Sequence, residues 1–295
     1  MGLRLSRKIR TIKNKTLEKI KKSNLTIYKF LIIFGSLFKF ISKLIRRKKT
    51  KFYSNNLDDI NRFEFKKTSQ NNEDGIINHI INTLKIKNLN FVEIGFDYYE
   101  NNCLNLINRT KTGLFIDGSD EKVFILRWLL KIFFPFRNIK VLKEMINKDN
   151  INLLISKNFY SDSEIDFMSI DVDGIDYYIF ENLRFNPKII CLEYNFWFGS
   201  EEKCSVPYSD NFSWEMGSTY SGASLSALCF LAKRKDYHLI AIDSSGVNAF
   251  FIRGDLKENF QILDPQKSFK IPNKYNNEEI ELAKKELLNR DLTFF

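Results

Sequence analysis

Three acidic residues directly follow an apolar run in the sequence IDFMSIDVDGIDYYIFENL, which spans residues 165–183. Asp171 and Asp173 are two residues apart, and Asp176 follows them. Residues two apart on a strand point the same way, so the first two carboxylates are predicted to converge. Converging carboxylates share a proton, hold a metal ion or bind a cationic ligand. The stretch fits a metal-binding Asp-x-Asp, the catalytic end of a parallel strand, or a turn in which Asp176 caps the next helix.

Stretches with strand character alternate with helical patterns from residue 69 onward. The predicted strands are LNFVEIG (89–95), GLFIDG (113–118), a start at NIKVLKEMI (138–146), IDFMSID (165–171), KIICLEYN (188–195), and the terminal pair HLIAID (238–243) and NAFFIR (248–253). The helical patterns are GIINHIINTLKI (75–86), VFILRWLLKIFF (123–134) and SLSALCFLAKRK (224–235). This alternation predicts an α/β fold with a mostly parallel sheet that is covered on both faces.

Acidic residues end four of the predicted strands, at the edge where such sheets carry their functional crevice. The strand ends are Glu93 to Gly95, Asp117, Asp171 to Asp173, and Glu193 to Asn195. Asp117 lies about twenty residues beyond Gly95, where an acid commonly accepts hydrogen bonds from ribose hydroxyls. The loop GFDYYENN after the first strand has one glycine, whereas a dinucleotide-binding loop requires three. A nucleoside without a pyrophosphate therefore fits this edge better.

An ordered set of motifs extends this interpretation over roughly residues 69–256. The motifs are SQNNEDGIINHI, FVEIG, LFIDGS, SIDVDGIDYYIFENL, LEYN, VPY, GASLSALCFLAKRKDYHLI and NAFFIR. In this order they resemble an FkbM-like branch of the S-adenosylmethionine-dependent methyltransferases. The resemblance implies a Rossmann-like, doubly wound, mostly parallel sheet of seven strands, with S-adenosylmethionine (SAM) as the cofactor.

The resemblance also assigns the cofactor-binding residues by position. Glu93 and Gly95 would line the methionine part of SAM. Asn101 and Asn102 would occupy the start of the following helix, and Asp117 would bind the ribose. All five positions lie at or just after the first two predicted strand ends.

The reaction that the resemblance implies is methyl transfer to an oxygen of a small-molecule or glycan-like acceptor. Asp171 and Asp173 would stand beside the transferred methyl group, with Glu193 and Asn195 facing them; Asp171, Asp173 and Glu193 are the expected catalytic residues. One aspartate would act as general base, or both would hold Mg²⁺ together with Asn195. The acceptor is expected at the long segment 196–222, because its aromatic rings, hydroxyls and acids suit sugar rings.

Two other classes of function remain open. The Asp-x-Asp at 171–173 also fits a glycosyltransferase that binds Mn²⁺ and a sugar nucleotide. Against this class, the acids at the two earlier strand ends would need another explanation. The third alternative is a membrane-tethered binding protein without catalytic activity.

Positive charge is concentrated near the N-terminus. The formal net charge is +10, but residues 1–51 contain 17 of the 46 Lys and Arg residues and only one acid, Glu18. Residues 52–295 therefore carry an excess of acidic residues and have no electrostatic footprint for nucleic acid. We predict a basic amphipathic extension over residues 1–51 and a methyltransferase-like α/β domain over residues 52–295.

The stretch LTIYKFLIIFGSLFKFISKLI, residues 25–45, predicts an amphipathic helix in this extension. Lys29, Lys39 and Lys43 share one side of the helix with Ser36. Each lysine would cost roughly 2.5–3.5 kcal/mol near a bilayer centre, which argues against a membrane span. The apolar side fits either a membrane surface or the surface of the domain itself.

The sequence also indicates where the protein works. The basic cluster RRKKTK, residues 46–51, suits anionic lipid head groups. Four cysteines without a CxxC pair are typical of reduced thiols. We therefore expect a cytoplasmic protein with peripheral contact at the inner face of the membrane.

Overall fold

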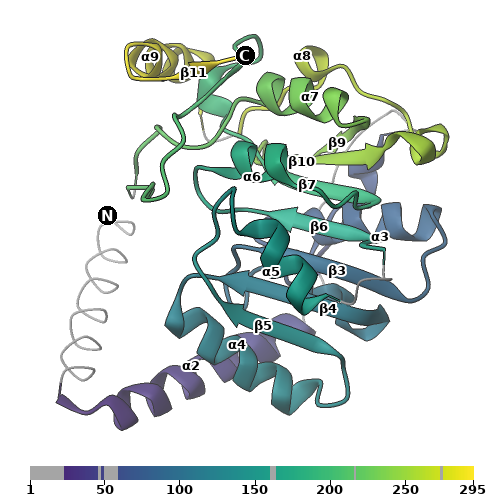
Figure 1. Cartoon of the computed structure of the whole chain (residues 1–295), viewed down its shortest axis with the longest axis vertical. Coiled ribbons are helices and arrows are strands. Elements are labelled where there is room, and N and C mark those ends of the chain that lie inside the picture. Colours follow the sequence, from purple (N-terminus) through teal and green to yellow (C-terminus); the bar gives the residue numbers. More distant parts are fainter. Residues whose placement is uncertain (1–22, 46–47, 50–58, 160–163, 216, 273–274) are drawn as a thin grey trace.

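A seven-stranded sheet lies at the centre of the structure, a computed structural model that describes residues 23–45, 48–49, 59–159, 164–215, 217–272 and 275–295 (Figure 1). Its strands are β3 (Leu89–Ile94), β4 (Thr110–Asp117), β5 (Ile139–Lys143), β6 (Phe167–Ile170), β7 (Ile189–Glu193), β9 (Tyr237–Ile242) and β10 (Asn248–Arg253). Each coincides with a predicted strand to within a few residues, so the sheet was predicted correctly.

The strand order is β5-β4-β3-β6-β7-β10-β9. The five strands from β5 to β7 pair in parallel, and β10 lies antiparallel between β7 and β9. The chain first builds outward from β3 to β5 and then returns to place β6 on the other side of β3. Such a reversal creates a crevice at the carboxyl ends of the strands. This order confirms the predicted Rossmann-like methyltransferase fold.

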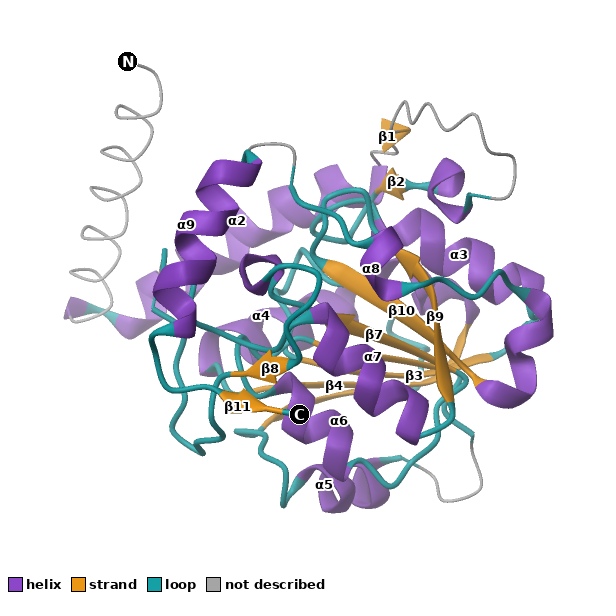
Figure 2. Cartoon of the chain, turned by 90° about the horizontal axis from the view of Figure 1, so that it is seen from above, coloured by secondary structure: helices purple, strands orange, loops and turns teal. Residues whose placement is uncertain are grey.

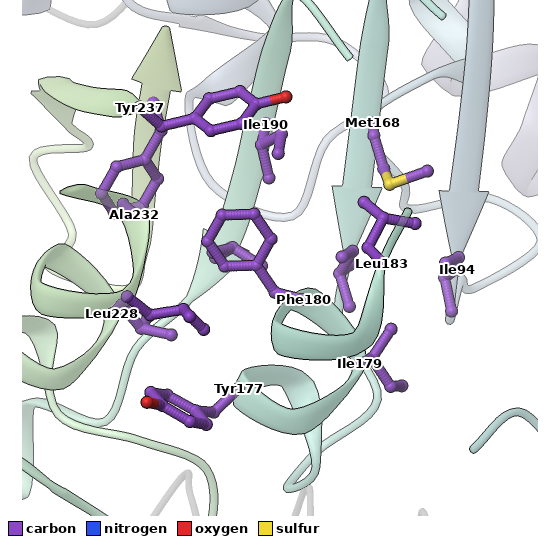
Figure 3. Packing of buried hydrophobic residues seen from close by; sticks show 14 of the residues in the cluster. Ile94, Met168, Tyr177, Ile179, Phe180, Leu183, Ile190, Leu228, Ala232 and Tyr237 are labelled. Atoms are coloured by element: carbon purple, nitrogen blue, oxygen red, sulfur yellow. The ribbon is translucent and has the colours of Figure 1, made fainter. Parts of the chain in front are cut away.

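Two layers of helices cover the sheet (Figure 2). The helices α5 (Ile151–Asn158), α6 (Asp176–Asn182) and α7 (Leu225–Arg234) cover one face, and α3 (Glu73–Thr83) and α4 (Asp120–Phe133) cover the other. Side chains alternate between the faces along each strand: Val92 packs with the first layer, and Phe91 with the second. In Figure 3, Phe180 of α6 lies between the sheet and α7.

Local signals explain the helix starts beside the crevice. Ser119 accepts a hydrogen bond from the backbone N–H of Lys122 and caps α4. Ser224 caps α7 in the same way through the N–H of Ala227. Hydroxyl caps of this kind satisfy backbone donors that lack a partner within the helix. The caps therefore fix where α4 and α7 leave the carboxyl edge of the sheet.

Further elements lie outside the main sheet and its two helical layers. They are α2 (Leu25–Ile45), β1 (Lys48–Lys49), η1 (Ile60–Phe63), β2 (Phe65–Lys66), η2 (Leu104–Arg109), η3 (Phe196–Phe198), β8 (Cys204–Ser205), η4 (Gly254–Asn259), α8 (Pro265–Ser268), α9 (Asn277–Leu288) and β11 (Thr293–Phe294). β11 pairs with β8 and so brings the C-terminal residues onto the long segment after β7. Phe295 stacks on Tyr177 of α6 with 4.0 Å between ring centroids.

The predicted helix over residues 25–45 forms as α2, but its orientation was not foreseen. Ser36, on the polar side, is buried, and Lys43 pairs with Glu100 of the domain. The polar side of α2 thus faces the domain, because charged partners there offset the burial of polar groups. Among the described residues, no helix is long and apolar enough to cross a membrane. The division at residue 51 remains a prediction.

Candidate functional site

Glu93, at the end of β3, organises the loop that follows. Its buried carboxyl group accepts hydrogen bonds from the backbone N–H groups of Asn102 and Cys103, both at 2.8 Å. Burial raises the pKa of Glu93 to about 8. The two bonds fold residues 95–103, here called the β3 loop, back over the end of the strand.

Gly95 is required where the β3 loop crosses the end of β6. Its φ is +71°, in the left-handed region that glycine adopts without strain. A Cβ atom at this position would lie 1.6 Å from the carbonyl oxygen of Asp171. Any side chain would therefore push the β3 loop away from the carboxylates after β6.

Asn101 and Asn102 lie in the β3 loop just before η2, a 3-10 helix, rather than at the start of a helix as expected. The Asn101 side chain accepts from the N–H of Leu104 and donates to the carbonyl of Asp97. The Asn102 amide donates to the hydroxyl of Ser169 at 2.9 Å. Both residues therefore shape the loop.

Asp117, at the end of β4, connects the β3 loop to α4. Its carboxylate accepts hydrogen bonds from the N–H groups of Phe96 at 3.2 Å and Ser119 at 2.7 Å. The Nζ of Lys122 lies 3.3 Å from the same carboxylate. Sequence analysis gave Lys122 no role, because its pairing with Asp117 depends on how α4 leaves the sheet.

The carboxyl groups of Asp171, Asp173 and Glu193 converge, with one oxygen from each within 4.8 Å of the others. The predicted cause was wrong: β6 ends at Ile170, so neither aspartate belongs to the strand. A turn brings them together instead, in which Asp173 has a left-handed φ of +59°. Aspartate tolerates this conformation better than most side chains.

These three carboxyl groups differ in their protonation. Burial raises the pKa of Glu193 well above its ordinary value, and the charge of Asp171 and their mutual hydrogen bond add to this effect. Burial also raises the pKa of Asp171. The hydrogen bond with Glu193 lowers it and so opposes this rise. Partial burial of the Asp173 carboxyl group, in a residue that is exposed as a whole, together with the charge of Asp171 raises the pKa of Asp173 to about 6. These shifts favour a proton on Glu193 against Asp171, and Asp173 is the group that ionises near neutral pH.

Asp176 and Asn195 hold the surrounding backbone. Asp176 accepts hydrogen bonds from the N–H groups of Val172 and Gly174, so it fixes the turn before α6 instead of capping the helix as expected. The Asn195 side chain accepts from the N–H of Trp197 and donates to the carbonyls of Thr219 and Ser221. These contacts give Asn195 a structural role and do not support its expected role as a metal ligand.

Two cavities meet at the carboxylates. One, of about 180 Å³, is lined by the β3 loop and Lys122. The other, of about 270 Å³, is lined by aromatic side chains after β7, including Trp197 and Trp214. Both are lined by Gln70, Asp171 and Asp173. A larger cavity of about 530 Å³ lies between η1, β9 and residues 258–270 and shares none of these residues.

Three further lining residues received no role from the sequence. Gln70 and Glu73 belong to the motif SQNNEDG, and Asn248 begins β10. The Asn248 amide donates to the Glu73 carboxyl group at 2.8 Å. β10 is paired with β7 so that Asn248 stands opposite Glu193. The antiparallel strand β10 therefore places Asn248 beside Glu73 in the wall of the smaller cavity. No local sequence pattern predicts this contact.

No protein-family model and no curated protein matches the chain. Magnesium protoporphyrin IX methyltransferase (ChlM) from Synechocystis PCC 6803 with bound SAM is 8% identical; the similarity covers 61% of this chain and 77% of that one, with a TM-score of 0.42. An S-adenosylmethionine-dependent methyltransferase from Clostridium acetobutylicum ATCC 824 is 10% identical over 62% and 90% of the two chains, with a TM-score of 0.41. The N-terminal domain of EvdMO1 with SAH bound is 10% identical over 63% and 80%, with a TM-score of 0.43. Similarities this distant carry no argument, and the class of fold rests on the strand order.

Proposed function

We propose that the protein is a SAM-dependent methyltransferase that transfers the methyl group to an oxygen of a small-molecule or glycan-like acceptor. The observation that carries this proposal is the pair of cavities that meet at Asp171 and Asp173. One cavity follows the first strand of the fold, where a nucleoside cofactor is expected. The other has aromatic walls suited to an acceptor. Donor and acceptor would thus meet beside ionisable groups.

The residues of the smaller cavity fit SAM. Its walls include the carboxyl groups of Glu93, Asp97, Asp171 and Asp173, and such a wall attracts a sulfonium cation. The β3 loop, shaped by Glu93 and Gly95, would hold the methionine part together with Asn101 and Asn102. Asp117 would bind the ribose. When bound, SAM supplies an electrophilic methyl group for in-line displacement.

Within this proposal, Asp173 is the general base. It lines both cavities, and its pKa of about 6 lets it be ionised near neutral pH and still accept a proton from a hydroxyl group. Asp171 and Glu193 share a proton behind it, and this arrangement lowers the charge repulsion at the site. The three groups also form an oxygen donor set that suits Mg²⁺.

The acceptor cavity supports a sugar-like substrate. Phe196, Trp197 and Trp214 line it together with Ser218 and Ser221. Aromatic faces pack against sugar rings, and hydroxyl groups exchange hydrogen bonds with sugar hydroxyls. The same proposal includes three further points. The protein is related to the FkbM-like methyltransferases, and it does not act on nucleic acid. It is cytoplasmic and contacts the membrane peripherally through residues 1–51.

Calorimetry of the full chain with SAM and S-adenosylhomocysteine (SAH) tests the proposal. We expect both ligands to bind. Asp117→Ala should weaken binding by about 1–3 kcal/mol, the usual cost of losing a charged hydrogen-bond partner. Asp120→Ala is the matched control, because that aspartate lies three residues further along, at the start of α4, and its side chain is 89% exposed.

Three outcomes would redirect the assignment. Heat with a sugar nucleotide plus Mn²⁺, but none with SAM or SAH, would indicate a glycosyltransferase. No heat with any of these ligands would indicate a non-catalytic binding protein. Loss of methyl transfer on dialysis against EDTA, with recovery on adding Mg²⁺, would make the carboxyl cluster a metal site rather than a base.

A further inference from the structure

One side of α2 carries an exposed apolar surface. Its residues are spaced three, four or seven apart, which places them on one side of a helix. Their exposed fractions lie between 37% and 78%. This surface, here called the α2 stripe, consists of Ile27, Leu31, Phe38, Ile41 and Ile45.

The opposite side of α2 packs on the domain. Phe40 is fully buried, and its ring lies 5.1 Å from that of Phe133 on α4. Ser36, also on this side, is 2% exposed. A surface helix normally buries its most apolar side and leaves its polar side in water. Because α2 also leaves a continuous row of apolar side chains in water, the α2 stripe has the character of an interaction surface.

The buried side of α2 also contacts the β3 loop. Lys43 forms an ion pair with Glu100, and Glu100 lines the smaller cavity. The Nζ of Lys39 lies 4.6 Å from the ring centroid of Tyr99. Two consecutive residues of the β3 loop, Tyr99 and Glu100, are therefore held by α2.

Charge identifies the partner of the α2 stripe. Residues 1–51 as a whole contain 17 basic residues and one acid; two of the 17, Lys39 and Lys43, contact the β3 loop. A second copy of the chain would bring two such basic extensions together, which is unfavourable. An anionic lipid surface offers both a place for the apolar side chains and complementary charge.

We propose that the α2 stripe docks on an anionic lipid bilayer and that docking orders the β3 loop. Both the bilayer and the β3 loop bind the helical form of α2. Most of the stability of a helix in a protein comes from the packing of one of its sides, so each partner increases the helical population that the other binds. The docking surface rests on the membrane contact that belongs to the proposed function, whereas a consequence for cofactor affinity rests on the proposed binding of SAM.

Vesicle cosedimentation of the full chain tests the surface. We expect binding to phosphatidylcholine vesicles that contain phosphatidylglycerol at low salt, and weak binding to pure phosphatidylcholine vesicles. The double variant Phe38→Ser, Ile45→Ser should bind at least about tenfold more weakly, because it removes the two most exposed side chains of the α2 stripe. Phe136→Ser, at a residue that is 98% exposed outside α2, is the matched control and should bind normally.

Hydrogen exchange of residues 95–103 tests the coupling without a cofactor. Anionic vesicles should slow exchange of the β3 loop by about fivefold or more, the lower end of typical coupling between sites. The double variant should show no slowing, and Glu100→Gln should bind vesicles with less slowing. If SAM and SAH fail to bind, the proposed function falls, but both of these measurements still report on the surface.

Three results would overturn the inference. The first is no binding to anionic vesicles at low salt. The second is vesicle binding with unchanged or faster exchange of the β3 loop, which would mean that the bilayer draws α2 away from the domain. The third is a dimer that the Phe38→Ser, Ile45→Ser variant abolishes, which would identify a second copy as the partner.

Discussion

Carboxyl groups at two pairs of strand ends perform different tasks in this fold. At β3 and β4, Glu93 and Asp117 accept hydrogen bonds from backbone N–H groups and so build the β3 loop. At β6 and β7, oxygens of Asp171, Asp173 and Glu193 converge within 4.8 Å of one another and line a cavity. Both regions use carboxyl groups at the same edge of the sheet. The difference is that the first two carboxyl groups bind the backbone of the β3 loop, whereas the other three mainly contact one another.

This difference has an energetic side. A typical hydrogen bond contributes about 0.5–1.5 kcal/mol to stability, and a buried donor without a partner costs more, so the first pair supports the fold. Like charges held close together oppose folding unless a proton or a cation relieves them. Sites that retain such a cost are enriched in function. The two regions should therefore respond to mutation in opposite ways.

The largest expected effect is at Asp173. Asp173→Asn removes the charge but keeps the shape, and asparagine also tolerates a φ of +59°. If Asp173 is the general base, methyl transfer should fall by roughly a hundredfold or more. The free energy of unfolding should stay the same or rise, because charge repulsion is removed. Single-turnover methyl transfer and denaturant unfolding measure the two quantities.

The matched control is Asp236→Asn. Asp236 has a φ of +58° and is 80% exposed at the end of α7, away from the carboxyl cluster. The same substitution in the same backbone conformation should leave methyl transfer unchanged. Strong destabilisation of Asp173→Asn with normal activity per folded molecule would show that the cluster is structural.

A smaller and opposite effect is expected at Glu93. Glu93→Gln leaves an acceptor for only one of the two N–H groups, at Asn102 and Cys103, that the carboxyl group now satisfies. A buried donor without an acceptor costs about 1–3 kcal/mol. The free energy of unfolding should fall by this amount, with Glu144→Gln, at an exposed residue after β5, as the control. Unchanged stability with a hundredfold loss of activity would place Glu93 among the catalytic groups instead.

The sequence contained enough information for the fold but only part of the site. Strand and helix periodicity reflect burial, so all seven strands of the main sheet were predicted, and the acids at their ends marked the correct edge. Lys122 escaped because its pairing with Asp117 depends on how α4 leaves the sheet. The pair of Glu73 and Asn248 joins residues 175 positions apart, and sequence patterns carry no signal at that range.

Two predictions from local patterns did not fix the arrangement in space. The convergence of Asp171 and Asp173 was expected from strand alternation, but a left-handed turn produces it. The apolar side of α2 was expected to contact either a membrane surface or the domain; in the structure Phe40 and Lys43 contact the domain, while Phe38 and Ile45 are exposed. Local sequence patterns do not encode the backbone turn in the first case or the tertiary contacts in the second.

The smallest predicted effect is a pH dependence that belongs to the β6 and β7 region alone. The pKa of Asp173 is raised to about 6 by burial first and by the charge of Asp171 second. A general base must be ionised, so kcat/KM for the acceptor should fall about tenfold for each pH unit below 6.

The free energy of unfolding should change in the opposite direction with pH. The folded state holds the Asp173 proton more tightly than the unfolded chain, whose aspartate pKa is about 3.9. The stability that this proton contributes is complete below about pH 4 and is lost as the pH rises through 6.

Lys122→Met tests the assignment of this titration. The positive charge of Lys122 lowers the pKa of Asp173, so its removal should move the midpoint of the kcat/KM profile to higher pH. Lys122 also contacts Asp117, so the maximum value of kcat/KM is expected to change as well. The pH of the midpoint does not depend on this maximum value. Glu93→Gln provides the comparison with the other region: the midpoint of its kcat/KM profile against pH should not shift. If Lys122→Met leaves the midpoint in place, or if activity rises toward acid, a group other than Asp173 takes the proton.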